Sequence, residues 1–121
     1  MKAREIVAMM ASPEGFPVPK EVVVEFALGQ IDRGEVEVFH YGPTVFTVHK
    51  DTGETHIYSL GNQHLLRAAK KFMDEVWGRV WVRFLEAPIL NPGVAKLAIR
   101  HGWYMVGVNG TGHMIYRIER S

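Results

Sequence analysis

The sequence predicts an α/β chain of the α+β type, in which helices pack on a mixed, mostly antiparallel sheet. Residues 35–60 alternate apolar and polar side chains with a period of two and are interrupted by turn residues, as in strands joined by hairpins. Residues 65–76 instead place apolar side chains three and four positions apart, which is typical of an amphipathic helix. Residues 79–108 follow the order strand, helix, strand. Such a crossover joins parallel strands, so the sheet is expected to be mixed.

The N-terminal part is expected to hold a short helix and a linker. Apolar residues within positions 3–11 fit a helix that ends before a stretch rich in Pro and Gly. We therefore divide the chain into residues 1–18, an N-terminal helix and linker, and residues 19–121, the main unit of a single compact domain. Pro19 suits the first turn of a second helix, although the run Val22-Val23-Val24 favours a strand for its first half. No first strand is evident before residue 35.

Three strands follow as an antiparallel meander, at residues 36–41, 44–50 and 55–60. Pairing the two acidic residues that flank Thr52-Gly53 sets the register of the last two strands. This register places His49 opposite His56 and Thr47 opposite Tyr58 on one face of the sheet.

A helix after Gly61-Asn62 leads into a strand at residues 79–85, which stops near Pro88. A second helix then leads to a hairpin of residues 104–108 and 113–118, joined across Asn109-Gly110. Asn-Gly between alternating segments is a strong hairpin signal.

The bulk composition is that of an ordinary globular domain. The chain has 121 residues, 47% of them hydrophobic and 22% charged, and its formal net charge is +1. The absence of cysteine excludes disulfides and thiolate metal sites, and no other pattern predicts a metal site. No apolar run reaches the roughly 20 residues that a membrane helix needs, and the charge gives no drive toward nucleic acid. A cytoplasmic protein without a membrane partner is expected.

Residues 91–103 form the most informative segment. Asn91 suits a helix cap, Pro92 the first helical position, and Gly102 the left-handed stop before Trp103. This order resembles the C-terminal signature of the GNAT family of acyl-CoA-dependent N-acyltransferases, which runs Asn, a helix, then Gly-Phe. The element order is similar over residues 19–118, and the compact form looks most like short GNAT-like proteins encoded by bacteriophages.

The resemblance implies an acetyl-CoA site where strands 55–60 and 79–85 splay apart. Backbone N–H groups at the start of the next helix would hold the pyrophosphate, since a helix N-terminus offers unpaired donors and a positive dipole end. The cofactor-binding residues implied are Leu60, Gly61, Asn62, Gln63, Arg67 and Asn91. The loop has one glycine where the family has two small residues. The alternative reading is that Ser59 or Asn62 caps this helix.

The active site implied by the resemblance is degenerate, because Ala98 stands where many family members carry a tyrosine that protonates the leaving thiolate. The candidate catalytic residues are His56, Tyr58 and Glu54 on the third strand, since histidine suits proton transfer near neutral pH. The alternative reading of this face is a solvated polar surface.

Two functions follow from the sequence. The first is an N-acetyltransferase that moves an acetyl group from acetyl-CoA to an amine. The alternative is a catalytically inactive GNAT-like binding or regulatory protein that acts on a protein partner. A homodimer formed through exposed edge strands is also compatible with the sequence.

Overall fold

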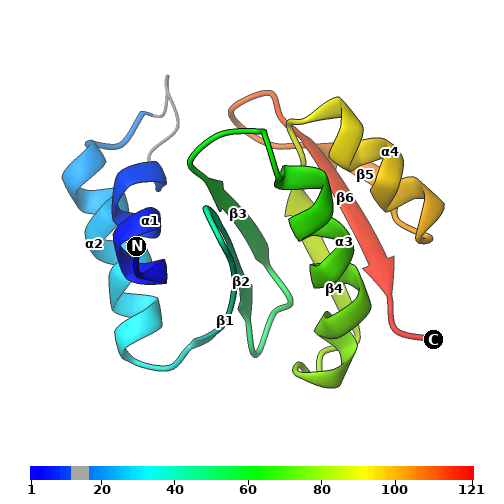
Figure 1. The fold of residues 1–121 in the computed structure, drawn as a ribbon, viewed down its shortest axis with the longest axis horizontal. Coiled ribbons are helices and arrows are strands. Elements are labelled where there is room, and N and C mark those ends of the chain that lie inside the picture. The colour runs from blue at the N-terminus through cyan, green and yellow to red at the C-terminus, as the bar shows by residue number, and fades with distance from the viewer. Residues whose placement is uncertain (12–16) are drawn as a thin grey trace.

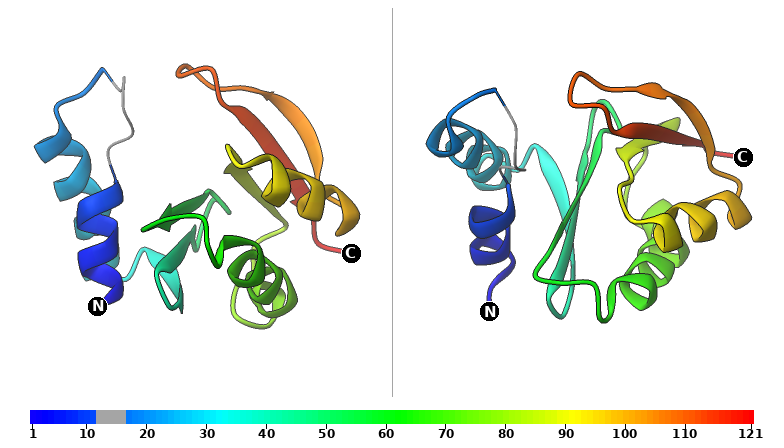
Figure 2. Two further views of the ribbon diagram at one scale, coloured as in Figure 1. Left: turned by 45° about the horizontal axis from the view of Figure 1, so that its top comes forward. Right: turned by 90° about the horizontal axis from the view of Figure 1, so that it is seen from above.

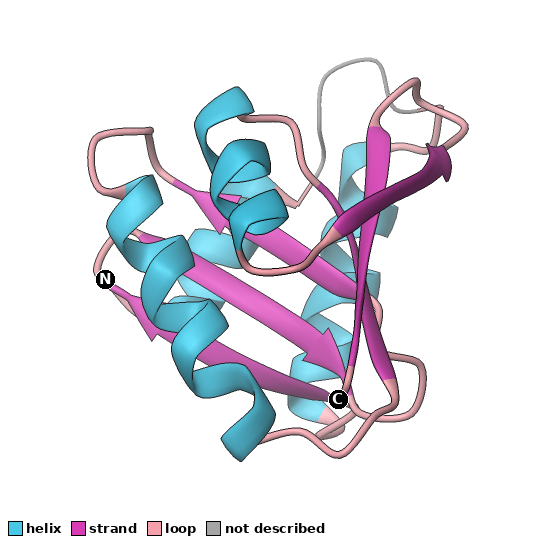
Figure 3. Cartoon of the chain, turned by 90° about the vertical axis from the view of Figure 1, so that its right-hand side faces the viewer, coloured by secondary structure: helices cyan, strands magenta, loops and turns pink. Residues whose placement is uncertain are grey.

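The computed structural model describes residues 1–11 and 17–121, so most of the expected linker lies outside the described residues. The chain folds as an α+β protein in which helices cover both faces of the N-terminal strands 36–41, 44–49 and 55–59 (Figures 1 and 3). The elements are α1 Ala3–Met10, α2 Lys20–Asp32, β1 Val36–Tyr41, β2 Thr44–His49, β3 Thr55–Ser59, α3 Leu65–Glu75, a 3₁₀ turn Val76–Gly78, β4 Phe84–Pro88, α4 Pro92–Arg100, β5 Tyr104–Val108 and β6 Met114–Glu119. Within the described residues, no helix has the length and apolar character required to cross a membrane.

The strands form two antiparallel sheets of three strands each, in the orders β1-β2-β3 and β4-β6-β5. The predicted antiparallel meander is therefore confirmed, and so is the hairpin β5-β6. The crossover strands β4 and β5 do run parallel, but β6 lies between them and hydrogen-bonds to both. The one parallel pairing in the described part of the chain is a bridge between Glu54 and Glu86, which joins the two sheets.

The predicted register of β2 and β3 is wrong by two residues. His56 pairs with Thr47 and Tyr58 pairs with Val45, so His49 does not face His56. The cause is the turn, which spans four residues rather than two: the backbone N–H of His49 donates to the carbonyl of Glu54 at 2.8 Å. A shift of two keeps the same side chains on the same face, because the side-chain period of a strand is two.

The strand predicted at residues 79–85 is displaced toward the C-terminus. The 3₁₀ turn extends α3 to Gly78, and β4 begins only at Phe84 and includes Pro88. Before β4, backbone carbonyls accept hydrogen bonds from a side chain and not from a neighbouring strand. The Arg120 guanidinium donates to the carbonyls of Val80 and Trp77 at 2.7 and 3.1 Å. Pro88 is tolerated because β4 is an edge strand of the second sheet and pairs with β6 alone in that sheet.

Two hydrophobic cores lie on opposite faces of the meander. One packs α1 and α2 against β2, and its fully buried residues include Ile6, Val7 and Val45. The other packs α3 on the opposite face, where the ring of Phe72 stacks on Phe46 with centroids 4.4 Å apart. Seen from above, α1 and α2 occupy one side of the meander while α3 and α4 occupy the other (Figure 2). The valine-rich start of α2 is helical, so the strand alternative for this segment is wrong.

The two sheets meet at one point and then diverge. The backbone N–H of Glu86 donates to the carbonyl of Gly53 at 3.1 Å, beside the bridge between Glu54 and Glu86. No backbone hydrogen bond of the described residues joins the remainder of β3 to β4. The splayed pair of strands that the resemblance implies is therefore present, between β3 and β4.

Candidate functional site

A cavity of about 850 Å³ lies at the divergence of β3 and β4. Its walls come from α1 and α2, from β3 and the first residue of α3, from the connection between β4 and α4, and from the β5–β6 hairpin. Cavities of this size are typical of small-molecule and cofactor sites, which occur where elements of different parts of a fold converge. Four segments that are far apart in the sequence thus contribute to one site.

The cavity brings together five of the nine residues predicted from the sequence. They are Glu54, His56 and Tyr58, which were expected to be catalytic, and Asn62 and Asn91, which were expected to bind the cofactor. The other loop residues, Leu60, Gly61 and Gln63, lie in the same β3–α3 connection and are exposed, but they do not line the cavity. Arg67 lies in a separate groove.

Residues 54, 56 and 58 share one face of the β3 segment because alternate residues of a strand point the same way. The Nε2 atom of His56 lies 3.0 Å from Oε1 of Glu54, and the rings of His56 and Tyr58 have centroids 6.2 Å apart. The hydrogen bond with His56 lowers the pKa of Glu54 below its ordinary value, so this carboxylate is ionised at neutral pH. Burial raises the pKa of Tyr58, so its phenol stays protonated.

The reading of this face as a solvated polar surface is wrong for its centre. Thr47 and Val45, which pair with His56 and Tyr58, are 5% and 0% exposed. Helix α1 covers them, and the ring of Tyr58 packs against the core formed by α1 and α2. His56 remains partly accessible, with 38% of its side chain exposed. The face therefore combines a buried aromatic end with an accessible histidine.

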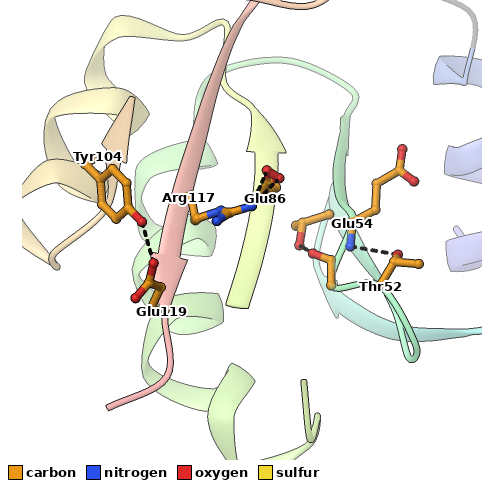
Figure 4. A network of polar contacts seen from close by, with 8 residues as sticks. Thr52, Glu54, Glu86, Tyr104, Arg117 and Glu119 are labelled. Atoms are coloured by element: carbon orange, nitrogen blue, oxygen red, sulfur yellow. Dashed lines mark hydrogen bonds and ion pairs between the residues drawn. The ribbon is translucent and has the colours of Figure 1, made fainter. Parts of the chain in front are cut away.

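The turn that precedes β3 fixes the carboxylate end of this site. The backbone N–H of Glu54 donates to Oγ1 of Thr52 at 3.2 Å. On the neighbouring strand, the guanidinium of Arg117 donates to the carboxylate of Glu86 at 3.1 Å. Figure 4 shows Glu86 turned toward Arg117 and the carboxylate of Glu54 pointing away from both. The two glutamates pair through their backbones, but their carboxylates bind different side chains: Glu86 binds Arg117 and Glu54 binds His56.

The N-terminus of α3 has no side-chain cap. The hydroxyl of Ser59 donates to the carbonyl of Gly61 at 2.6 Å, and Asn62 contributes its backbone carbonyl, which accepts from the N–H of Leu65 at 3.3 Å. The alternative in which Ser59 or Asn62 caps this helix is therefore wrong. In the described chain, no protein acceptor takes the backbone N–H groups of Leu66 and Arg67. These donors sit at the positive end of the helix dipole.

Asn91 caps α4 and also lines the cavity. Its Oδ1 atom accepts from the N–H groups of Gly93 and Val94 at 2.9 and 3.1 Å, which confirms the predicted helix cap. The same side chain lines the cavity, and its amide NH₂ takes no part in the cap. Ala98, seven residues further along α4, is fully buried and does not line the cavity. Helix α4 therefore supplies an amide donor but no acid to the site.

A second, basic groove of about 510 Å³ runs between α3 and α4. Four cations line it, together with Leu66, Gly93 and Leu97: they are Arg67, Lys70, Lys96 and Arg100. Among residues 1–11 and 17–121, no carboxylate lines it, and one of its cations has an ion-pair partner, since Lys70 lies 3.8 Å from Asp74. Among these cations, the sequence had pointed to Arg67 only. The four-residue spacing of Lys96 and Arg100 was the signal that could have identified the other side.

Sequence reasoning also missed part of the cavity wall. Asn109, Thr111 and His113 line it from the β5–β6 hairpin. Oδ1 of Asn109 accepts from the N–H groups of Thr111 and His113 at 3.0 and 2.9 Å, and the Thr111 hydroxyl lies 2.9 Å from Nδ1 of His113. The predicted hairpin thus places a second histidine at the site. Within residues 1–11 and 17–121, no three His, Asp or Glu side chains gather as a metal site would require.

Comparison with known proteins gives a weak likeness in structure. No protein-family model matches the chain, and no curated protein matches it in sequence. Among solved structures, the chain is similar to an acetyl transferase from Salmonella typhimurium that modifies the N-terminal serine of 50S ribosomal subunit protein L7/L12. The two share 15% identity with a TM-score of 0.49, over 97% of this chain and 87% of the other. A likeness of this strength does not identify the family of the chain.

Proposed function

We propose that this protein binds acetyl-CoA and transfers the acetyl group to an amine. The observation that supports this function best is the composition of the cavity between the diverging strands β3 and β4. It joins a His56–Glu54 pair, the protonated phenol of Tyr58 and the amide of Asn91. A base, an acid and an orienting amide are the groups that acyl transfer to an amine requires.

The residues present fit an acyl-CoA in both polarity and charge. Leu65 and Pro92 line the cavity, and the residues that follow them, Leu66 and Gly93, line the basic groove, so the two spaces adjoin at the start of α3 and α4. An acyl-pantetheine arm would occupy the cavity, and the nucleotide phosphates would face Arg67 and the other groove cations. The unpaired N–H groups at the start of α3 add donors for an anion. When bound, acetyl-CoA supplies an acetyl group activated as a thioester.

The chain's own residues divide the proton transfers. Glu54 accepts the hydrogen bond of His56 and holds the imidazole in one orientation, so the histidine takes the proton from the acceptor amine. Tyr58, whose phenol stays protonated, would be the proton donor for the thiolate that leaves.

One observation favours the alternative of a binding protein without catalysis. Ala98 is buried in the core, and the resemblance implies that an acid should come from this position of α4. If Tyr58 does not replace it, the site binds but does not turn over. The acetyltransferase must bind acetyl-CoA and release free CoA, whereas the binding or regulatory protein acts on a protein partner and releases none.

Thermal melting with acetyl-CoA tests the proposal. A ligand that binds the folded state adds about 2.7 kcal/mol of stability at a hundred times its Kd, so the melting temperature should rise with ligand concentration. The double variant Arg67→Gln, Lys96→Gln should raise the Kd of acetyl-CoA at least about tenfold, so the melting temperature should rise less at the same ligand concentration. Lys71→Gln, which changes a cation of α3 outside the groove, is the matched control.

The outcomes separate the two functions. A melting temperature that does not move at millimolar acetyl-CoA would remove the acetyltransferase and leave the binding or regulatory protein. A shift without release of free thiol, measured over a panel of amines, would favour the binding protein.

A further inference from the structure

We infer that the acceptor is a primary amine carried on a bulky apolar group, held between α1, α2 and the β4–α4 connection. This inference rests on the proposed acetyltransferase function and adds the class of its acceptor. It follows from the part of the cavity wall that the proton-transfer residues do not use.

The wall formed by α1 and α2 is apolar although it is accessible. Met9, Met10 and Phe26 line the cavity and are 53%, 41% and 63% exposed. Across the cavity, Leu90 is 60% exposed. Large apolar side chains that converge on one concave surface, instead of being scattered singly, are typical of a binding site.

The residue types suit an aliphatic or aromatic guest. Methionine side chains are unbranched and polarisable, so they adapt to an apolar group of irregular shape and contact aromatic rings favourably. Phe26 offers a ring face at the same wall. Helix α2 brings it there because Val23 and Phe26, three residues apart, lie on one side of the helix, and both line the cavity.

The charges of the cavity exclude other classes of amine. Glu54 is the one carboxylate among the described lining residues, and it is already paired with His56. A polyamine or another polycation would need several carboxylates and finds one among the described residues. No lysine or arginine is among these lining residues, so an acceptor with acidic groups next to the amine finds no cation.

The position of His56 orients the guest. This base lines the cavity from β3, whereas the apolar wall comes from α1 and α2, which pack on the same face of the meander. An amine that reaches His56 therefore places its attached group against Met10 and Phe26. The same chemistry is offered by a small free amine and by the N-terminus of a peptide that begins with a bulky apolar residue.

Acceptor kinetics at saturating acetyl-CoA test the inference, with free thiol as the product measured. The acceptors are phenylethylamine, the dipeptide amides Phe-Gly and Ser-Gly, and spermine. Phenylethylamine or Phe-Gly amide should exceed both others at least tenfold in kcat/KM, a ratio that a hydrophobic pocket readily provides. Comparison of the first two distinguishes a small amine from a peptide N-terminus.

A variant pair on α2 separates the pocket from general effects. Phe26→Ser should lower kcat/KM for the apolar acceptors about tenfold and leave the Kd of acetyl-CoA unchanged. Val22→Ser is the matched control, since Val22 is 53% exposed on the same helix and does not line the cavity. Equal effects of the two variants would overturn the inference.

A measurement of amine binding by NMR tests this inference separately from the proposed function. With ¹³C-methyl methionine, phenylalaninamide should shift the methyl signals of Met9 and Met10 but not that of Met105, which lies on β5 outside the cavity. Failure of acetyl-CoA to bind would overturn the acetyltransferase and this inference together. Binding of acetyl-CoA with spermine or Ser-Gly amide as the best acceptor would overturn this inference alone.

Discussion

Replacing Gly53 with alanine tests how the two sheets are joined. Gly53 is buried in the turn before β3 and has a φ of +77°. A Cβ atom added there would lie 2.0 Å from the carbonyl oxygen of Phe84, which belongs to the backbone of β4. Because this neighbour is backbone, no change of rotamer can remove the clash. The β2–β3 turn would have to move away from β4.

The magnitude follows from two costs. A side chain in the left-handed region costs roughly 1–2 kcal/mol, and forcing a methyl group into packed space typically costs about 1–3 kcal/mol more. Gly53→Ala should therefore lower the free energy of unfolding by roughly 2–5 kcal/mol. Gly34 has a φ of +71° with no atom within 4 Å of an added Cβ, so Gly34→Ala should cost only the first part.

Urea denaturation followed by circular dichroism measures the difference between the two variants. At about 4 °C for each kcal/mol in a domain of this size, thermal melting should also separate them by several degrees. Equal losses of stability in Gly53→Ala and Gly34→Ala would refute the close approach of the β2–β3 turn to β4. A loss with unchanged affinity for acetyl-CoA would refute the view that this junction positions the site.

Three further outcomes are expected. Asn91→Ser keeps a capping oxygen, so the melting temperature should stay nearly constant while the affinity for acetyl-CoA falls. If the melting temperature and the affinity fell together, Asn91 would act as a helix cap only. The pKa of Glu54 is lower in the folded chain than in the unfolded one, so its contribution to stability is complete above the unfolded pKa and is lost as the pH falls through the folded value. Carboxyl NMR should show that His56→Ala raises this pKa, and an unchanged titration would show that another group lowers it. Ala98→Tyr overfills a fully buried position and should cost about 1–3 kcal/mol or more in unfolding free energy; a variant as stable as wild type would contradict the buried placement.

Local patterns sufficed for most elements. The cap at Asn91, the stop at Gly102 and the apolar spacing of α3 depend on residues within one or two turns, so the helices could be predicted. The start of β4 could not, because the segment before it is held by Arg120, some forty residues away. The β-prone residues of this segment do not indicate that a guanidinium distant in sequence donates to its backbone carbonyls.

The candidate site divides in the same way. Glu54, His56 and Tyr58 share a face because the strand period is two, and this survives the error in register. The error itself came from the length of the turn, in which Gly53 has a left-handed backbone and lies close to β4.

By itself, then, the sequence determined the order of the elements, the α+β class and which face of β3 carries the polar residues. These follow from periodicity and capping, which act over a few neighbouring positions. Only the tertiary structure decided that α1 and α2 close the cavity with Met10 and Phe26, and that Arg67 and Lys96 line one groove. Those features depend on contacts between segments far apart in the chain, and no local pattern encodes where such segments meet.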